Sequence, residues 1–500
     1  MVDYGVNVIR QPSGVQAPRT ARSALSVFVG VAPMANATNP AKPNEVVMCQ
    51  TMSEFESRFG VSNDYLTYRL NGAAWLLFEV MRVRPVIFCS VLDVDKPAHT
   101  ASKMRNVDLT QRFGFARETV ITDFGVIPAM LQARLTDTGG LPIGSPLVQG
   151  EDFVLGVDGA GYTTIKAVMG GAIFALDGIQ ETVTVALDYD CVNPAGVTNL
   201  DIIGSGSSGL STGLRTISRV FPRLREVPAL VMAPGFSDAA VIAALTGACR
   251  DINSVFQANC IADIDSTATG ARTYDQVVDF KFKAGMTDDR LLACWPCARF
   301  GDRIIHMSTV MAGLANVADA ENNAPAEILS NLLINCNGFC LEDGTPVELS
   351  LDEANVLRGN GVATGLFWDG GFRSWGAYTA AWPANTDPAY SFFNISRHMS
   401  WHANHLVLTY FQNVDMDYSR DNIENVLDTE NDFLRSLHAR GITPISSIAY
   451  PPEYNSDGDL LLGRMVFLVL LADYIPTQQI NFLQRFNFQA LRDEILGGAA

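Results

Sequence analysis

The stretch Leu25-Ser-Val-Phe-Val-Gly-Val-Ala32 decides the fold class of this chain. Its apolar residues follow one another almost without interruption, which predicts a buried strand. A short helix is predicted over 53–59, a longer helix over 65–80, and a second buried strand over 83–92. Strand, helix, strand in this order is typical of α/β packing.

The same pattern resumes after residue 204. Further buried strands are predicted over 228–234, 256–264 and 290–296. A helix capped by Ser237 should run to about Arg250, and another is predicted over 308–320. Residues 23–95 and 205–345 are therefore predicted to form one α/β core that another segment interrupts.

The interrupting segment, residues 96–204, consists of short β-prone runs between Gly, Asp-Gly and Asn-Pro turns. This spacing is typical of an all-β unit, so we expect one inserted β-rich domain.

Residues 346–475 are predicted to form a C-terminal α+β domain. The predicted helices span 350–358, 393–411 and 420–440. The predicted strands are a hairpin over 362–378 and a single strand over 460–472. Ser419 should cap the last helix.

Both termini are predicted to be extended arms. In residues 1–22, Tyr4, Val6 and Val8 alternate with polar or small residues. In residues 476–500, four apolar residues are predicted to lie on one face of a strand over 478–489, namely Ile480, Phe482, Phe486 and Phe488. A strand so isolated in sequence needs a sheet to join.

Composition narrows the function classes. The 500 residues include 35 Lys and Arg and 53 Asp and Glu, a net charge of −18, and only 18% are charged while 48% are hydrophobic. No apolar run is long enough to span a membrane, and we expect an intracellularly made chain with nine reduced cysteines. The acidic balance argues against direct nucleic-acid binding. A surface that partners cover would explain the low charge.

The segment Gly204-Ser-Gly206-Ser-Ser-Gly209 matches the G-x-G-x-x-G pattern of dinucleotide-binding loops. There, a pyrophosphate rests on the N-terminus of the next helix, and an acid about twenty residues later binds the ribose. The segment follows a strand-like run over 199–203, but Glu226 precedes the next strand instead of ending it. A Ser- and Gly-rich joining loop is the alternative interpretation, and we expect no cofactor.

Two cysteine pairs have the residue types of a zinc site. Cys294 and Cys297 form one pair, and Cys336 and Cys340 form the other. The first pair lies in a strand-like apolar run, whereas zinc knuckles usually form at turns. We expect buried thiols and no metal.

His398, His402 and His405 recur at i, i+4 and i+7, which places them on one helix face. No distal carboxylate can be identified to complete a metal site, so we expect interface or partly buried histidines.

No catalytic residue stands out. The chain has no Gly-x-Ser-x-Gly elbow in a strand-turn-helix setting and no subtilase motif. Asp263 and Asp265 end a predicted strand, where solvated turn carboxylates are the default. We therefore expect a protein that is not an enzyme.

A last signal is a series of segments spread along nearly the whole chain. They include Gly5-Val-Asn-Val, Ser26-Val-Phe-Val-Gly-Val-Ala-Pro, Pro228-Ala-Leu-Val-Met-Ala-Pro-Gly, Gly371-Phe-Arg-Ser-Trp-Gly-Ala-Tyr-Thr-Ala and, on a helix, Arg397 and Trp401. In these segments the chain resembles the tail sheath proteins of contractile bacteriophage tails and related phage-tail-like particles.

The resemblance implies an α+β multidomain fold with a subtilisin-like α/β sheath core, an inserted β-rich outer domain, a C-terminal α+β domain and two strand arms. It implies a structural subunit that polymerises as stacked rings around the tail tube. The sheath contracts to drive the tube through the host cell envelope for genome ejection, and neighbours are linked by the arms.

The implied partners are copies of this chain, the tail tube protein, and baseplate and tail terminator proteins, with no direct nucleic acid and no membrane insertion. The implied location is the virion tail, assembled in the host bacterial cytoplasm. Arg435 and Arg440 are candidate tube contacts. Two alternatives stay open at this point: a nucleotide-dependent oxidoreductase using the Gly204–Gly209 loop, and a subtilase-like hydrolase.

Overall fold

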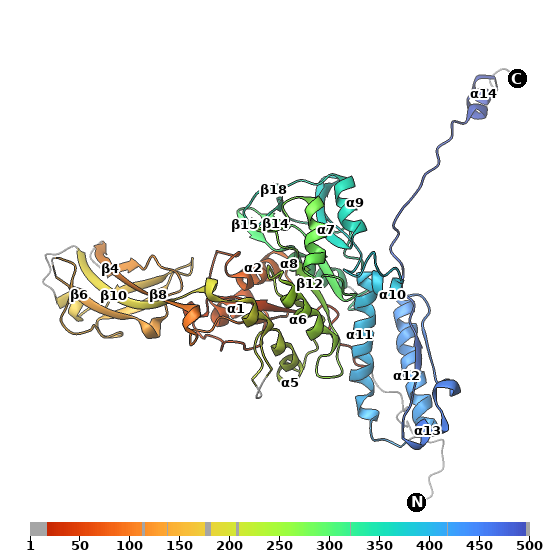
Figure 1. The fold of residues 1–500 in the computed structure, drawn as a ribbon, viewed down its shortest axis with the longest axis horizontal. Coiled ribbons are helices and arrows are strands. Elements are labelled where there is room, and N and C mark those ends of the chain that lie inside the picture. Colours follow the sequence, from red (N-terminus) through yellow and green to blue (C-terminus); the bar gives the residue numbers. More distant parts are fainter. Residues whose placement is uncertain are drawn as a thin grey trace, which may run out of the picture.

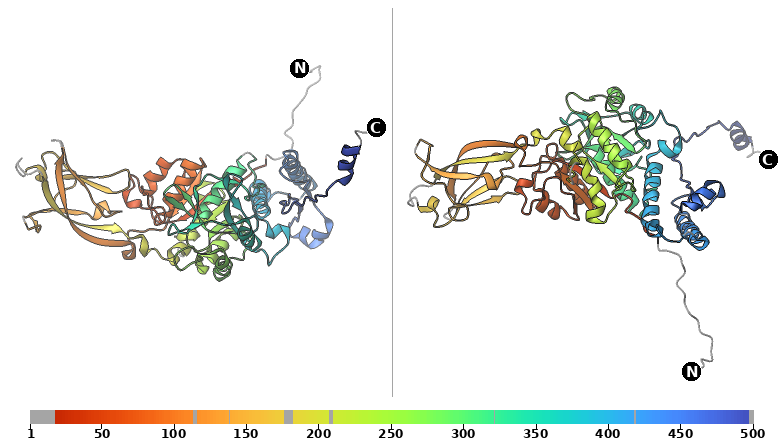
Figure 2. Two further views of the ribbon diagram at one scale, coloured as in Figure 1. Left: turned by 90° about the horizontal axis from the view of Figure 1, so that it is seen from above. Right: turned by 60° about the horizontal axis from the view of Figure 1, so that its bottom comes forward.

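A computed structural model of the protein describes residues 18–112, 116–137, 139–175, 182–206, 210–320, 322–417 and 419–496. The molecule is elongated, with a β-rich lobe at one end, an α/β body in the middle and a pair of long helices at the other end (Figure 1). The two further views in Figure 2 show the same three-part order.

The body is built on one nine-stranded sheet in the order β16-β20-β19-β13-β12-β11-β1-β3-β2. The six strands from β19 to β3 pair in parallel, and the strands at both ends pair antiparallel. The strands are β1 Ser26–Gly30, β2 Val47–Cys49, β3 Val86–Ser90, β11 Leu230–Met232, β12 Asn259–Asp263, β13 Leu291–Cys294, β16 Leu333–Ile334, β19 Val362–Trp368 and β20 Gly371–Trp375. The predicted strands 25–32, 83–92, 228–234, 256–264 and 290–296 are thus confirmed, each with shorter ends.

Both faces of this sheet are buried, which explains why its strands are apolar throughout. Val27 and Val29 of β1 pack into one core and Phe28 into the other, because successive side chains point to opposite faces. The helices of the Phe28 side are α1 Met52–Phe59, α2 Arg69–Trp75 and α8 Met307–Asp319; those of the opposite side include α6 Ala239–Arg250, α7 Tyr274–Lys283 and α9 Leu351–Gly359. The N-cap of α6 is Asp238, whose side chain accepts from the Ala240 N–H, and not the predicted Ser237.

The interrupting segment forms a separate seven-stranded antiparallel sheet in the order β7-β6-β10-β4-β5-β9-β8. Its strands are β4 Thr100–Arg112, β5 Ala116–Val120, β6 Gln132–Thr136, β7 Pro142–Ile143, β8 Phe153–Val157, β9 Thr163–Ala167 and β10 Thr182–Val192. The long strands β4 and β10 pair from Thr100 with Val192 to Thr110 with Thr182. This sheet has its own core, which includes Phe153, and the segment contacts the body where the Tyr68 and Phe124 rings meet and where the Asn36 side chain donates to the Gly161 carbonyl.

The sheet of the body extends further along the chain than predicted. The hairpin β19–β20, expected within a C-terminal domain over 346–475, joins the body because Val362 and Ala363 pair with Ala293 and Cys294 of β13. A hairpin pattern is local in sequence and does not specify which sheet the hairpin extends. A small sheet in the order β15-β14-β17-β18 packs beside this hairpin. Its strands are β14 Cys297–Phe300, β15 Arg303–Ile305, β17 Gly338–Cys340 and β18 Pro346–Val347.

Two long helices dominate the end of the molecule opposite the β-rich lobe (Figure 1). They are α11 Phe393–Tyr410, which the short α10 Pro388–Ser391 precedes, and α12 Arg420–Ala439. The Ser419 side chain accepts from the Asn422 N–H, as predicted for the cap of α12. A two-stranded hairpin follows, made of β21 Ser447–Ala449 and β22 Leu468–Leu470.

The predicted strand over 460–472 is wrong over most of its length. The helix α13 Asp457–Leu461 occupies its beginning, and only Leu468–Leu470 pair as a strand. A capping box explains the helix, since the Ser456 hydroxyl and the Asp459 carboxylate each bond the other residue's backbone N–H.

Phe88 offers a test of the sheet's aromatic core. It is fully buried, and its ring centroid lies 4.8 Å from that of Phe55 and 5.8 Å from that of Phe28. We expect Phe88→Ala to lower the free energy of unfolding by about 3–5 kcal/mol, measured by urea denaturation of the unassembled subunit.

Phe482→Ala is the matched control, because this ring is 85% exposed on the C-terminal arm. The control should change the free energy of unfolding by less than about 0.5 kcal/mol. Equal effects of the two variants would contradict the assignment of Phe88 to the core.

Candidate assembly interface

The C-terminal arm leaves the body with its apolar side chains exposed. Beyond Gln478, whose side chain accepts from Arg358 of α9 at 2.8 Å, the chain runs away from the rest of the molecule, and its last described element is α14 Phe488–Leu496 (Figure 1). The predicted arm residues Ile480, Phe482, Phe486 and Phe488 are 69, 85, 80 and 64% exposed. Such continuous apolar exposure marks a surface for association.

The predicted strand over 478–489 has a different structure in the single subunit. Residues 478–487 are extended and pair with no strand among the described residues, and Phe488 begins a helix. The Asn487 side chain accepts from the Ala490 N–H and so caps this helix. Without a sheet to join, an extended segment has no ladder to define it as a strand.

The N-terminal arm is described only from residue 18, so Tyr4, Val6 and Val8 lie outside the described residues. The described root lies along α11. The Arg19 N–H donates to the Thr409 hydroxyl at 3.0 Å, and the Trp401 indole donates to the Ala21 carbonyl at 2.9 Å. The arm therefore enters the body along this helix.

The three histidines of α11 are buried and have a carboxylate partner that the sequence did not reveal. Glu430 of α12 is fully buried and lies 2.8 Å from His402 Nε2 and 3.1 Å from His405 Nε2. His398 Nδ1 lies 2.7 Å from the Asp473 carboxylate at the root of the C-terminal arm. The expectation that no distal carboxylate accompanies these histidines is thus wrong.

The electrostatics of this cluster favour a charged Glu430. Burial by itself raises the pKa of Glu430, but the bonds from His402 and His405 outweigh burial and bring it down to about 2. Burial lowers the pKa of His402. Both ring nitrogens of His405 face oxygen atoms, Glu430 at 3.1 Å on one side and the Arg19 carbonyl at 3.0 Å on the other.

The sequence contains a signal that would have identified Glu430. Val426, Phe433 and Leu437 mark the buried face of α12, and residue 430 falls on that face at helical spacing. A carboxylate on the apolar side of an amphipathic helix requires a buried partner.

The hairpin β21–β22 has unpaired edges. Its two strands pair only with each other among the described residues, and two-stranded hairpins are marginal alone. Beside it, the end of α11 and the hairpin enclose a cavity of about 900 Å³. Its largely apolar lining includes Val255, Tyr410, Phe411, Met416, Leu462 and Val469. An open edge next to an apolar groove is suited to accept an additional strand.

Arg435 and Arg440, the candidate tube contacts, are exposed on α12 and just after it. Arg435 pairs with Asp432, and Arg440 donates to the Asn322 carbonyl at 3.1 Å. The exposed face of α12 also carries Asp421, Glu424 and Asp428, so the two arginines lie in acidic surroundings.

A second polar cluster lies where the parallel strands of the body end. Asp263 follows β12 and, contrary to the expected solvated carboxylate, is buried. It accepts from the Ser308 hydroxyl at 2.6 Å and from the Ser308 N–H at 2.7 Å. His306 Nδ1 lies 4.0 Å from Asp263 and 3.7 Å from the Cys297 sulfur.

This cluster does not have the geometry of a hydrolase. Ser308 is fully buried, and its hydroxyl donates to Asp263 and not to an imidazole that could act as its base. Burial raises the pKa of the Cys297 thiol well above its ordinary value and lowers the pKa of His306. Asp263, Ser308 and Cys297 are therefore hydrogen-bonded core groups, while His306 Nε2 has no hydrogen-bond partner among the described residues.

The Gly204–Gly209 loop also lacks the setting of a dinucleotide site. The run before it, predicted as strand-like, is the helix α4 Asn199–Ile203, which a capping box at Thr198 begins. Gly204 has φ +70° and ends this helix, which explains the glycine. Residues 207–209 lie outside the described residues. Because no strand precedes the glycines, the oxidoreductase alternative has no support.

The predicted buried thiols are confirmed for Cys294, Cys297 and Cys340, and Cys336 is half-buried. Over the described ranges, no group of three or more His, Cys, Asp or Glu side chains is arranged to hold a metal ion. In the same ranges, no helix is long and apolar enough to cross a membrane.

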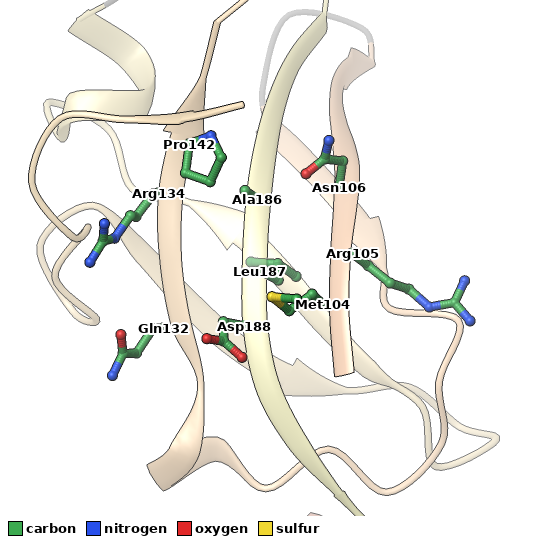
Figure 3. Close-up of a pocket in the computed structure, with 9 residues that line it drawn as sticks. All are labelled: Met104, Arg105, Asn106, Gln132, Arg134, Pro142, Ala186, Leu187 and Asp188. Atoms are coloured by element: carbon green, nitrogen blue, oxygen red, sulfur yellow. The ribbon is translucent and has the colours of Figure 1, made fainter. Parts of the chain in front are cut away.

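The outer sheet has a shallow hollow over β6, β10 and β4, shown in Figure 3. Arg105 and Arg134 at its sides point away from each other, and Arg105 pairs with Asp123. The hollow therefore offers no convergent set of charges for an anion.

Comparison with known proteins identifies the class. By fold, the chain matches the sheath complex of an extracellular contractile injection system, PVC, in the contracted state, with a TM-score of 0.57 and 11% identity over 98% of this chain and 99% of that one. It also matches a chain in the contracted-state baseplate of the anti-feeding prophage, with a TM-score of 0.56 and 10% identity over 97% and 99%. The fold is that of contractile sheath proteins.

In particular, the sequence is 23% identical over 480 residues to the tail sheath protein of Burkholderia phage BcepMu. The matched stretch covers 93% of this chain and 92% of that protein. No family model matches the chain. The resemblance to contractile tail sheath proteins is confirmed, and the similarity to one of them covers nearly the whole chain.

The low pKa of Glu430 makes the stability of the folded subunit depend on pH. A carboxyl group whose pKa is lower in the folded state stabilises the fold above its ordinary pKa of 4.5 and loses that contribution as the pH falls to about 2. We expect the free energy of unfolding to drop by about 3 kcal/mol across this window and Glu430→Gln to flatten the drop, measured by urea denaturation at each pH.

Glu424→Gln is the control, since this carboxylate on the same helix is exposed and pairs only with Arg420. It should leave the acid dependence of the wild type intact. An unchanged acid profile for Glu430→Gln would refute the role of the buried carboxylate.

Proposed function

We propose that this chain is the structural subunit of a contractile tail sheath that polymerises as stacked rings around a tail tube. Contraction of the sheath drives the tube through the host cell envelope for genome ejection. The observation that carries this proposal is an apolar arm, exposed along its length, on a body with the fold of contractile sheath proteins. The relationship to a phage tail sheath protein supports it.

The arms are the linking elements in this proposal. Residues 477–487 can extend over about 36 Å at roughly 3.3 Å per residue, enough to leave the surface of one subunit and reach the next. The unpaired edge of β21–β22 in a second copy is the acceptor, because added strands bond through the backbone and insert alternate side chains into a groove. The N-terminal arm with Tyr4, Val6 and Val8 links a further copy.

The core is part of the same proposal. Six parallel strands with helices on both faces are consistent with a subtilisin-like α/β core, and the buried Asp263, His306 and Ser308 stand at the strand ends without a catalytic arrangement. The subunit thus acts through its surfaces and arms, and not as an enzyme.

The other partners are the tail tube protein, the baseplate and the tail terminator, in a virion tail assembled in the host bacterial cytoplasm. Contraction needs no nucleotide in this proposal. Free energy stored at assembly is released as subunits repack, while the strand links persist.

Removal of residues 477–500 tests the C-terminal link. The described part of this segment, residues 477–496, contributes no side chain to the cores of the body, so the truncated subunit should fold with an unchanged melting temperature. We expect electron microscopy to show sleeves for the wild type and none for the truncation. Normal sleeves from the truncated subunit would contradict strand exchange.

Phe482→Asp and Phe482→Leu sharpen this test at one position. The charged variant should reduce sleeve formation at least tenfold, because a buried unpaired carboxylate costs more than about 1.4 kcal/mol. The apolar variant should keep it. Equal assembly by both variants would show that the Phe482 side chain is not buried in the sleeve.

Arg435→Glu tests tube contact. The charge reversal adds a fifth acidic residue to the exposed face of α12, which already carries Asp421, Glu424, Asp428 and Asp432. We therefore expect less sleeve protein to sediment with assembled tubes at low salt. Arg420→Glu is the control, at the other end of the same helix and also exposed. Equal binding by Arg435→Glu and wild type would remove α12 from the tube interface.

A further inference from the structure

We propose that α11 mechanically couples the two arms, so that tension from a neighbour bound to one arm passes through this helix to a neighbour bound to the other. The proposal rests on the sheath function above and adds a role for particular residues. It assigns Thr409, His405, Trp401 and His398 as positioning residues for the arms.

The N-terminal arm is held at the end of α11. The Thr409 hydroxyl accepts from the Arg19 N–H at 3.0 Å, and His405 Nδ1 donates to the Arg19 carbonyl at 3.0 Å. One turn earlier in the helix, the Trp401 indole holds the Ala21 carbonyl at 2.9 Å. Thr409 and His405 are fully buried while Arg19 is exposed, so the helix side of these bonds is shielded from water.

The C-terminal arm is held near the beginning of the same helix. His398 Nδ1 contacts the Asp473 carboxylate at 2.7 Å, and His398 is fully buried. The adjacent Ala472 N–H donates to the Ser446 hydroxyl at 3.0 Å. Figure 1 shows the C-terminal arm leaving beside one end of α11, far from the opposite end where Thr409 lies.

The attachment points of the two arms are close together and are joined by one rigid helix. Eleven residues of α-helix separate His398 from Thr409, which is about 16 Å at roughly 1.5 Å per residue. Along the chain the arms are separated by the whole body, residues 24–471. The helix is therefore the direct connection between them.

The helix is also fixed to the body, which a coupling element requires. The Asn404 side chain bonds both backbone groups of Gln257, accepting at 2.9 Å and donating at 2.7 Å. The Asn259 amide donates to Ser396 at 2.8 Å, and Glu430 binds His402 from α12. These buried directional bonds resist sliding of the helix in a way that apolar contacts alone do not.

Thr409→Val tests the coupling, because valine keeps the shape and removes the acceptor for the Arg19 N–H. We expect the amide of Arg19 to exchange its hydrogen about tenfold faster in the unassembled subunit, measured by site-resolved hydrogen exchange. Thr409→Ser restores the hydroxyl and should restore protection. Thr429→Val is the matched control, a buried threonine of α12 whose hydroxyl has no hydrogen-bond partner in the described part of the chain.

The second readout is contraction. Sleeves of Thr409→Val should break into contracted and extended stretches after triggering, while sleeves of Thr409→Ser and Thr429→Val contract along their full length, as seen by electron microscopy. Unchanged Arg19 exchange in Thr409→Val, or uniform contraction despite faster exchange, would overturn the proposal. If the wild type forms no sleeves, the sheath function fails, and the exchange measurement still decides whether α11 holds the arm.

Discussion

The arrangement of this molecule depends on one buried carboxylate, Glu430, and the row of polar side chains that faces it from α11. Twelve of the 18 residues of α11 are buried, and most of the larger ones are polar or aromatic with a polar tip. Burying such groups is unfavourable unless each finds a partner. Many of their partners lie on the body, on α12 and at both arm roots, and these contacts favour one position of α11. Apolar packing would permit small shifts of the helix, whereas this network does not.

The body provides the rigid support for that helix. Its parallel sheet is covered on both faces, and alternate residues of β1 divide between the two cores. Such a sheet has few ways to deform without exposing apolar side chains. The outer sheet has a core of its own and joins the body through the ends of β4 and β10. Changes in the outer sheet can therefore leave the interface end undisturbed.

The sequence predicted the elements whose signal is local and failed where partners are distant. Buried strands, the helices 393–411 and 420–440 and the cap at Ser419 follow from periodicity and capping chemistry. The partner of the β19–β20 hairpin depends on a strand about 70 residues earlier, and the pairing of Glu430 with two histidines depends on how α11 and α12 pack. The apolar arm residues were recognised from their spacing. Their conformation was not, because residues 478–487 have no strand ladder among the described residues of their own chain.

Low charge and exposed apolar arms have one physical explanation in a subunit that must move without dissociating. Side-chain contacts between rigid bodies are lost when the bodies rotate, but strand pairing through the backbone tolerates changes in the surrounding surface. In the proposed sheath this separates two tasks: body surfaces exchange one set of contacts for another, while the arms preserve connectivity. Connectivity is useful only if each arm is held firmly at its root. A loosely held root would let a neighbour move without pulling on the next subunit, and in the proposed coupling the bonds of Thr409 and His405 to Arg19 prevent that slack at the N-terminal root.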